Sequence, residues 1–224
     1  MIEHEFIDLF GGLWWITNIL TVAIIFSLIF FGKKLKHNQQ IEFGKVLGYF
    51  LLIRSVWIHF YQLYLGLWTI ESSLPLHLCG ISAILSGIVL ITKHQKLYEL
   101  LYFWGISGGY ISIVTPEFTI GTQGLLFIDY YVSHGGIIFS ALYCTLVLKM
   151  KPSQGSWLKI FIWSQLLILF IGGINYFLDS NYMYINAPPK VENPFVIGEF
   201  PFHLIGFELA GLLHFWLLSV PFRK

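Results

Sequence analysis

The sequence predicts an all-α, polytopic membrane protein with seven transmembrane helices. Three observations lead to this fold class: the 224 residues are 56% hydrophobic, only 11% are charged, and the apolar residues occur in long blocks. A soluble domain carries about 25% charged residues. A helix needs about 20 mainly apolar residues to cross a bilayer, and the blocks approach or reach that length. We therefore expect one integral membrane domain over residues 1–224.

The seven expected spans are separated by short loops, with one exception. The exception is residues 179–201, whose prolines and aromatic side chains suit an ordered lid at the membrane interface. A plain connecting loop is the alternative for this segment. The spans run roughly over residues 13–32, 44–65, 76–92, 97–115, 127–148, 157–178 and 202–220.

The positive residues predict the orientation of the chain. With the N-terminus outside, eleven of the thirteen Lys and Arg residues lie on the inner side; Lys190 alone lies outside, and Arg54 lies within a span. Inner loops of membrane proteins are enriched in Lys and Arg. We therefore expect the N-terminus outside and the C-terminus inside, as an odd number of spans requires.

Charge and cysteine content exclude several classes of function. The net charge is only +1, which gives no basis for nucleic-acid binding. Both cysteines, Cys79 and Cys144, fall inside spans, so a disulfide framework is not expected. We expect no cofactor, and the sequence does not predict the oligomeric state.

One stretch places an imidazole and a thiol two residues apart at the start of the third span. It reads Leu-Pro-Leu-His-Leu-Cys over residues 74–79. Pro75 suits the first position of a helix, which would place Cys79 about one turn inside it. The positive end of the helix dipole and a nearby base favour a reactive thiolate there. A free cysteine also packs as a small apolar residue, so both interpretations stay open for the stretch alone.

Polar side chains from five spans are expected at a similar depth, in the outer half of the bilayer. Ionisable groups inside a membrane are costly, so such a grouping indicates a functional site. The set comprises His59, Gln62, His77, Cys79, His134, Asn175 and His203.

Helical phase assigns partners within this set. His77 and Cys79 are two residues apart and should point to different sides of their helix. The base that contacts Cys79 is therefore expected from another span, with His134 as first choice. Arg54 lies deep and needs a partner, and Glu208 is the comparable acid, so we expect a structural Arg54–Glu208 ion pair.

Three chemistries could use this cluster. In covalent acyl transfer a Cys thiolate attacks a lipid ester, a His moves the proton, and donors such as Asn175 or Arg54 hold the oxyanion. A zinc site from the His and Cys residues is a second possibility, but no close ligand spacing supports it, and we expect no metal. A transporter path is the third, although the polar groups gather on one side. A non-catalytic scaffold is a further alternative.

Three motifs in this order resemble those of the YwaF-type bacterial integral membrane proteins. They are Leu-Pro-Leu-His-Leu-Cys at 74–79, Ser-His-Gly-Gly at 133–136 and Asn-Tyr-Met-Tyr at 181–184. That group is similar to the transmembrane-protein-164 acyltransferases, and the resemblance covers nearly the whole chain. It implies a multi-pass plasma-membrane protein that transfers acyl chains between phospholipids or other acyl-lipids. Cys79 would be its nucleophile, with His134 as the partner and His77 as the second choice; His59 and Gln62 are expected to contact substrate.

Overall fold

The structure is a computed structural model that describes residues 4–191, 193 and 195–223. Within these residues the regular secondary structure is helical apart from one short antiparallel strand pairing, in which Glu5 faces Phe118 and Phe6 faces Glu117. The elements are β1 (Glu5–Phe6), α1 (Gly12–Lys34), α2 (His37–Tyr64), α3 (Leu78–Thr92), α4 (Gln95–Leu100), the π-helix η1 (Leu101–Gly105), α5 (Ile106–Val114), β2 (Glu117–Phe118), α6 (Leu126–Leu146), α7 (Ser156–Leu178), the 3₁₀ turn η2 (Tyr182–Tyr184), α8 (Phe202–Ser219) and the 3₁₀ turn η3 (Val220–Phe222).

Each expected span coincides with a helical segment. The fourth is formed by α4, η1 and α5, which follow one another without a break. Among the described residues, three helices are long and apolar enough to cross a membrane: α1, α7 and the segment Phe202–Phe222. The all-α prediction is therefore confirmed, and the chain is a helical membrane protein with three candidate membrane spans.

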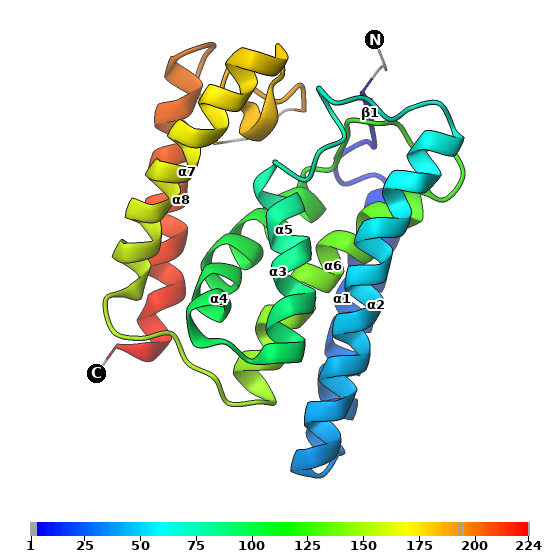
Figure 1. Ribbon diagram of the computed structural model, residues 1–224, viewed down its shortest axis with the longest axis vertical. Helices are drawn as coiled ribbons and strands as arrows, with labels where there is room; N and C mark the ends of the chain where they lie inside the picture. The colour runs from blue at the N-terminus through cyan, green and yellow to red at the C-terminus, as the bar shows by residue number, and fades with distance from the viewer. Residues whose placement is uncertain (1–3, 192, 194, 224) are drawn as a thin grey trace.

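The helices form two groups in Figure 1. In one group, α3 packs against α2 and α6, and α1 and α5 pack against α6. In the other, α7 and α8 lie side by side at one edge of the molecule. The N-terminus lies at the end of the molecule opposite the C-terminus (Figure 1).

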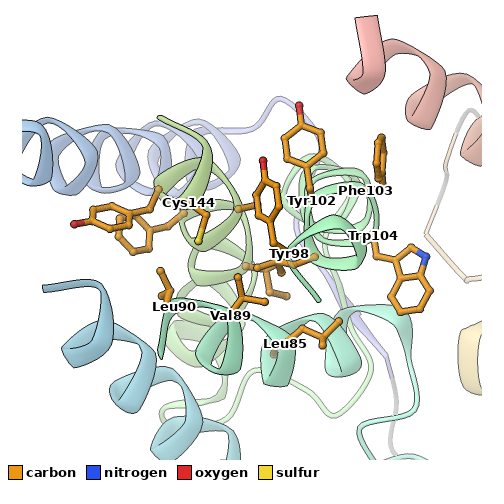
Figure 2. Close-up of a cluster of buried hydrophobic side chains, with 14 of the residues drawn as sticks. Leu85, Val89, Leu90, Tyr98, Tyr102, Phe103, Trp104 and Cys144 are labelled. Atoms are coloured by element: carbon orange, nitrogen blue, oxygen red, sulfur yellow. The ribbon is translucent and has the colours of Figure 1, made fainter. Parts of the chain in front are cut away.

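The buried core lies within the first group, where α3, α4, η1 and α6 meet (Figure 2). Val89, Leu90 and Phe103 are completely buried there, and so is Cys144, whose thiol packs in the core. The Tyr98 hydroxyl bonds with Thr145 Oγ1 at 2.8 Å and Met150 O at 3.2 Å, so this buried polar group is satisfied.

The start of α3 differs from the prediction. The helix begins at Leu78, so Pro75 stands before it and Cys79 is its second residue. The preceding residues form a separate turn, in which Leu76 N donates to Leu74 O at 2.7 Å. Gly80 packs so closely on this turn that a Cβ atom would lie 2.9 Å from Pro75 Cα. The local turn over residues 74–76 therefore replaces the helix start that the proline predicted.

Candidate functional site

A cavity of about 730 Å³ lies between the α7–α8 pair and helices α2, α3, α5 and α6. Residues of the segment 179–201, including Met183, Tyr184 and Phe195, form part of its wall, and we refer to this segment as the lid. The size falls within the range of about 300–1,000 Å³ typical of small-molecule sites. Of the predicted site residues, the cavity is lined by Arg54, His59, Gln62, His77, Cys79, His134 and Glu208.

Cys79 lies at the amino-terminal end of α3, where backbone donors are free. The helical hydrogen bonding begins with Ile81 N donating to His77 O, and the His77 side chain makes no capping bond. The N–H groups of the first turn, including that of Cys79 itself, therefore have no carbonyl partner within the helix. The thiol has Ser112 Oγ as its hydrogen-bond partner at 3.4 Å, and a Cβ on Gly108 would lie 3.4 Å from Sγ.

His134 is held in one tautomer. Its Nδ1 lies 2.8 Å from the carbonyl oxygen of Tyr130, which can only accept, so Nδ1 carries the proton. In the neutral ring the lone pair is then on Nε2. The predicted direct contact with Cys79 is not formed: the described residues give the thiol Ser112, not a histidine. Tyr130 links His134 to the Cys79–Ser112 pair. Its carbonyl oxygen accepts from His134 Nδ1, and its hydroxyl donates to Ser112 O at 2.8 Å.

His77 has the opposite tautomer. The backbone N–H of Met183 donates to its Nδ1 at 3.1 Å, so in the neutral ring Nε2 carries the proton. The ring also packs against Tyr182 and Tyr184, each with a centroid separation of 5.3 Å. His77 and Cys79 both line the cavity, contrary to the phase argument, because His77 precedes the helix and has extended backbone angles.

The predicted Arg54–Glu208 ion pair is wrong. Arg54 forms a bidentate ion pair with Asp129, through Nε and NH2, and its NH1 donates to Ser133 Oγ at 2.8 Å. Glu208 instead accepts from Gln165 Nε2 at 2.7 Å. The Asp129 side chain is only 11% exposed, so the ion pair is largely buried.

His59 and Gln62 lie one turn apart on α2 and both line the cavity. Trp68 Nε1 donates to His59 Nδ1 at 3.2 Å, which leaves the proton of the neutral ring on Nε2. Gln62 is 7% exposed, and its Oε1 is buried without a hydrogen-bond partner in the described part of the chain. Both side chains thus lie on the cavity wall, and their contact with substrate stays a prediction.

Asn175 does not lie where an oxyanion donor is needed. It is 1% exposed and is not among the residues that line the cavity. Its amide holds the turn before the lid: Nδ2 donates to Tyr182 O, while Oδ1 accepts from Ser180 Oγ and Tyr182 N, all at 2.8–2.9 Å. Three of the four hydrogen bonds that the amide can make thus shape the chain, and the side chain lies away from the cavity that its predicted role as oxyanion donor requires.

Comparison with known proteins agrees with the geometry of a helical membrane protein. A family model described as the TMEM164 family matches residues 9–219, nearly the whole chain. The chain belongs to the TMEM164 family. The family resemblance expected from the three sequence motifs is thereby confirmed.

One relative of this TMEM164-family chain is a Treponema pallidum (strain Nichols) protein described as uncharacterized. The two are 26% identical over 157 residues, which make up 68% of this chain and 63% of the relative. The alignment thus spans less than two thirds of the length of that relative. No solved structure matches the chain at a significant level.

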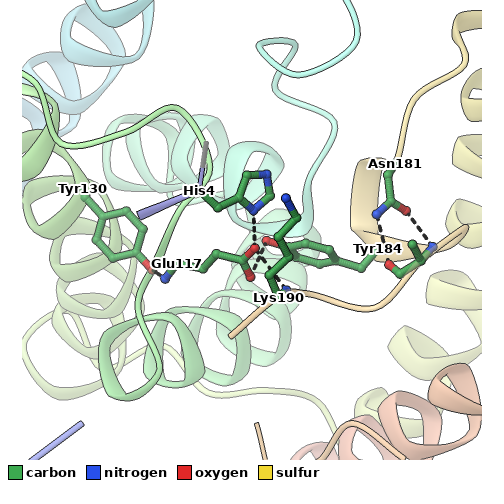
Figure 3. A network of polar contacts seen from close by, with 7 residues as sticks. His4, Glu117, Tyr130, Asn181, Tyr184 and Lys190 are labelled. Atoms are coloured by element: carbon green, nitrogen blue, oxygen red, sulfur yellow. Dashed lines mark hydrogen bonds and ion pairs between the residues drawn. The ribbon is translucent and has the colours of Figure 1, made fainter. Parts of the chain in front are cut away.

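The TMEM164-family fold also reveals a carboxylate network that sequence reasoning missed (Figure 3). Glu117 is 7% exposed and accepts hydrogen bonds from the His4 ring, the Lys190 backbone N–H and the Tyr184 hydroxyl. The network ties the residue before β1 and the lid to strand β2 (Figure 3). Burial raises the pKa of Tyr184 well above its usual value, so its hydroxyl stays protonated.

Ser112 and Tyr130 also line the cavity. The sequence did not predict them as site residues, because nothing distinguishes them from other residues of their spans. Tyr184 could have been predicted from the sequence, since it ends the Asn-Tyr-Met-Tyr motif at 181–184.

The described residues contain no group of three or more His, Cys, Asp and Glu side chains arranged to hold a metal ion. The zinc alternative therefore has no geometric support.

Proposed function

We propose that this protein is an integral membrane acyltransferase that moves a fatty acyl chain between lipids through a Cys79 thioester. In this proposal the seven helical segments cross the membrane, with the N-terminus outside, and the cavity lies in the outer half. The observation that carries the proposal is the shared cavity. Cys79, at the start of α3, and His134, from a second helix, both line one space large enough for an acyl chain.

In the first half-reaction, the Cys79 sulfur attacks the ester carbonyl of a donor lipid. His134 Nε2 takes the thiol proton after the thiol turns away from Ser112, and the tautomer fixed by Tyr130 keeps that nitrogen free. The carbon–oxygen ester bond then breaks. The leaving lipid alcohol receives the proton from His134, and the acyl chain remains on sulfur as a thioester.

The negative charge of the tetrahedral intermediate lies next to the first turn of α3. Backbone N–H groups there replace Asn175 as the oxyanion donors, and the helix dipole reinforces them. The His77 Nε2–H group is a further donor on the same cavity wall. In the second half-reaction, an acceptor hydroxyl loses its proton to His134 and attacks the thioester, which restores the thiol.

The test is acyl transfer by purified protein in liposomes that contain phospholipid with a labelled acyl chain. Cys79→Ser is expected to lower transfer by about 10³-fold or more and to abolish a hydroxylamine-sensitive acyl label on the protein. Cys144→Ala removes the other cysteine and is the matched control, which should retain the label. His134→Ala is expected to lower the rate by about 10²–10⁴-fold. Full transfer by folded Cys79→Ser would refute the proposed nucleophile.

A further inference from the structure

A second cavity, of about 220 Å³, lies at the opposite end of the molecule from the N-terminus. It is formed where the loop 152–155 enters α7 and where η3 ends the described chain (Figure 1). None of the residues assigned to acyl transfer lines it. Its wall consists of Phe103, Pro152, Ser153, Gln154, Gly155, Ser156, Trp157, Ser219, Phe222 and Arg223.

The first element of this cavity is the uncapped start of α7, a helix of 23 residues. Gly155 precedes it with a φ of 71°, and no side chain caps the helix. The first backbone hydrogen bond of the helix runs from Lys159 N to Gly155 O at 3.4 Å. The N–H groups of Trp157 and Leu158 therefore lie before the helical ladder, at the positive end of the helix dipole.

The second element is an orphaned hydroxyl. Ser156 lines the cavity and is only 2% exposed, yet its Oγ has no hydrogen-bond partner in the described part of the chain. Buried hydroxyls are normally satisfied, and leaving one unpaired costs about 1–3 kcal/mol. A ligand oxygen that accepts from Ser156 would remove this deficit.

The third element is a guanidinium group with spare donors. Arg223 Nε and NH2 donate to Ser219 Oγ at 3.1 and 2.9 Å, and the group packs over Trp157 and Trp216. Within the described chain, no carboxylate lies within ion-pair distance of Arg223. Glu99 contacts this loop, where its Oε1 accepts from Ser153 N and Oγ at 2.9 and 2.5 Å.

We propose that this cavity binds a phosphate group. A helix start, a hydroxyl without a hydrogen-bond partner and an arginine without an ion-pair partner, as far as the described residues go, line one small cavity, and together they match the several acceptor oxygens of a phosphate. With the N-terminus outside, this end faces the interior, where Lys151 and Lys159 add positive charge nearby. The phosphate comes either from the headgroup of an anionic phospholipid or from a free phosphate compound.

The experiment measures binding to the full chain, by native mass spectrometry and by thermal unfolding in detergent. One arm adds phosphatidic acid with phosphatidylcholine as reference, and the other adds inorganic phosphate. Retention of phosphatidic acid alone identifies a lipid headgroup, and an upward shift with inorganic phosphate identifies a soluble ligand. Either result supports the site, whereas neither form binding would overturn it.

The variants Ser156→Ala and Arg223→Gln test the assigned contacts. Each is expected to weaken binding about tenfold, the usual loss for one hydrogen bond to a charged group. Lys34→Gln removes a positive charge at the same end of the molecule, on α1, and should bind like the unaltered protein. Ser156→Ala removes a hydroxyl that makes no hydrogen bond within the described chain, so it should fold even if Arg223→Gln does not. Unchanged affinity in folded Ser156→Ala and Arg223→Gln would also overturn the proposal.

Discussion

At the scale of single residues, partner atoms decide what each histidine does. His134 and His77 line the same cavity, but one donates through Nδ1 to a carbonyl and the other accepts at Nδ1 from an N–H. The first ring therefore presents a lone pair and the second presents a donor. Sequence reasoning ranked His134 above His77 as the base, and the tautomers favour that order. It had no access to the tautomers themselves, because both partners are backbone groups.

Arg54 shows why depth alone does not identify a partner. Glu208 was chosen because both residues lie deep in their spans, whereas Asp129, in the first turn of α6, pairs with Arg54. An arginine side chain reaches several residues along a helix axis, so a carboxylate nearer the end of a span remains accessible. The packing of α2 against α6 brings the two together, and that packing is a tertiary property.

Breaking this pair should destabilise the protein strongly. Asp129→Asn leaves the Arg54 charge, 13% exposed, without its counter-ion, and loss of one partner of a buried pair costs about 3–5 kcal/mol. The midpoint of thermal unfolding in detergent should fall accordingly. The double variant Arg54→Met with Asp129→Leu should recover most of this loss. Additive losses in the double variant would show that the two charges do not interact.

At the scale of elements, the lid owes its shape to residues that looked catalytic in the sequence. Asn175 holds Tyr182, His77 holds the N–H of Met183, and His203 Nε2 lies 2.8 Å from Tyr184 O. Met183 and Tyr184 adopt left-handed φ values of 58° and 54°, which are unfavourable for such side chains. The motif at 181–184 is thus a turn held by side chains of α7, of α8 and of the residue before α3, and polar residues at equal depth can serve a turn as well as a reaction.

Removing the Asn175 amide should therefore loosen the lid. Asn175→Ala eliminates three buried hydrogen bonds, which contribute about 1 kcal/mol each, so unfolding should become easier by about 2–4 kcal/mol. Residues 180–186 should become readily cleaved by protease. Asn18→Ala, which removes a single bond from Asn18 Nδ2 to Trp14 O, is the matched control. A protease-resistant lid in Asn175→Ala would contradict the role assigned here.

The helices themselves were predictable, and the irregular segments were not. The apolar blocks of the sequence predicted the ends of all seven helical segments to within a few residues, except that α2 begins at His37 rather than near residue 44. The extension is polar, so hydropathy excludes it, but the Lys36 N–H bonds with Gln39 Oε1 at 3.1 Å and starts the helix. The π-helical turn η1 had no signal, because its five residues are all apolar or glycine and its geometry depends on burial.

At the scale of the whole molecule, the two cavities lie toward opposite ends of one bundle. The larger adjoins the lid and the N-terminal strand, and the smaller adjoins the start of α7 and the chain's last turn. The Lys-rich loops 33–36, 93–96 and 149–151 belong to the end that carries the smaller cavity. If acyl transfer uses the outer half of the membrane, the phosphate site must then face inward. The two proposals share one orientation, although each has its own test.

That orientation has a direct measurement. Single cysteines replace Lys190 and Lys149 in a background with Cys79→Ala and Cys144→Ala, and intact cells are treated with a membrane-impermeant maleimide. Because eleven positive residues favour one side against one on the other, Lys190→Cys should label in intact cells. Lys149→Cys should label only after the membrane is permeabilised. The reverse pattern would place the thiol cavity in the inner half, and labelling of both in intact cells would mean that the helix between them does not cross the membrane.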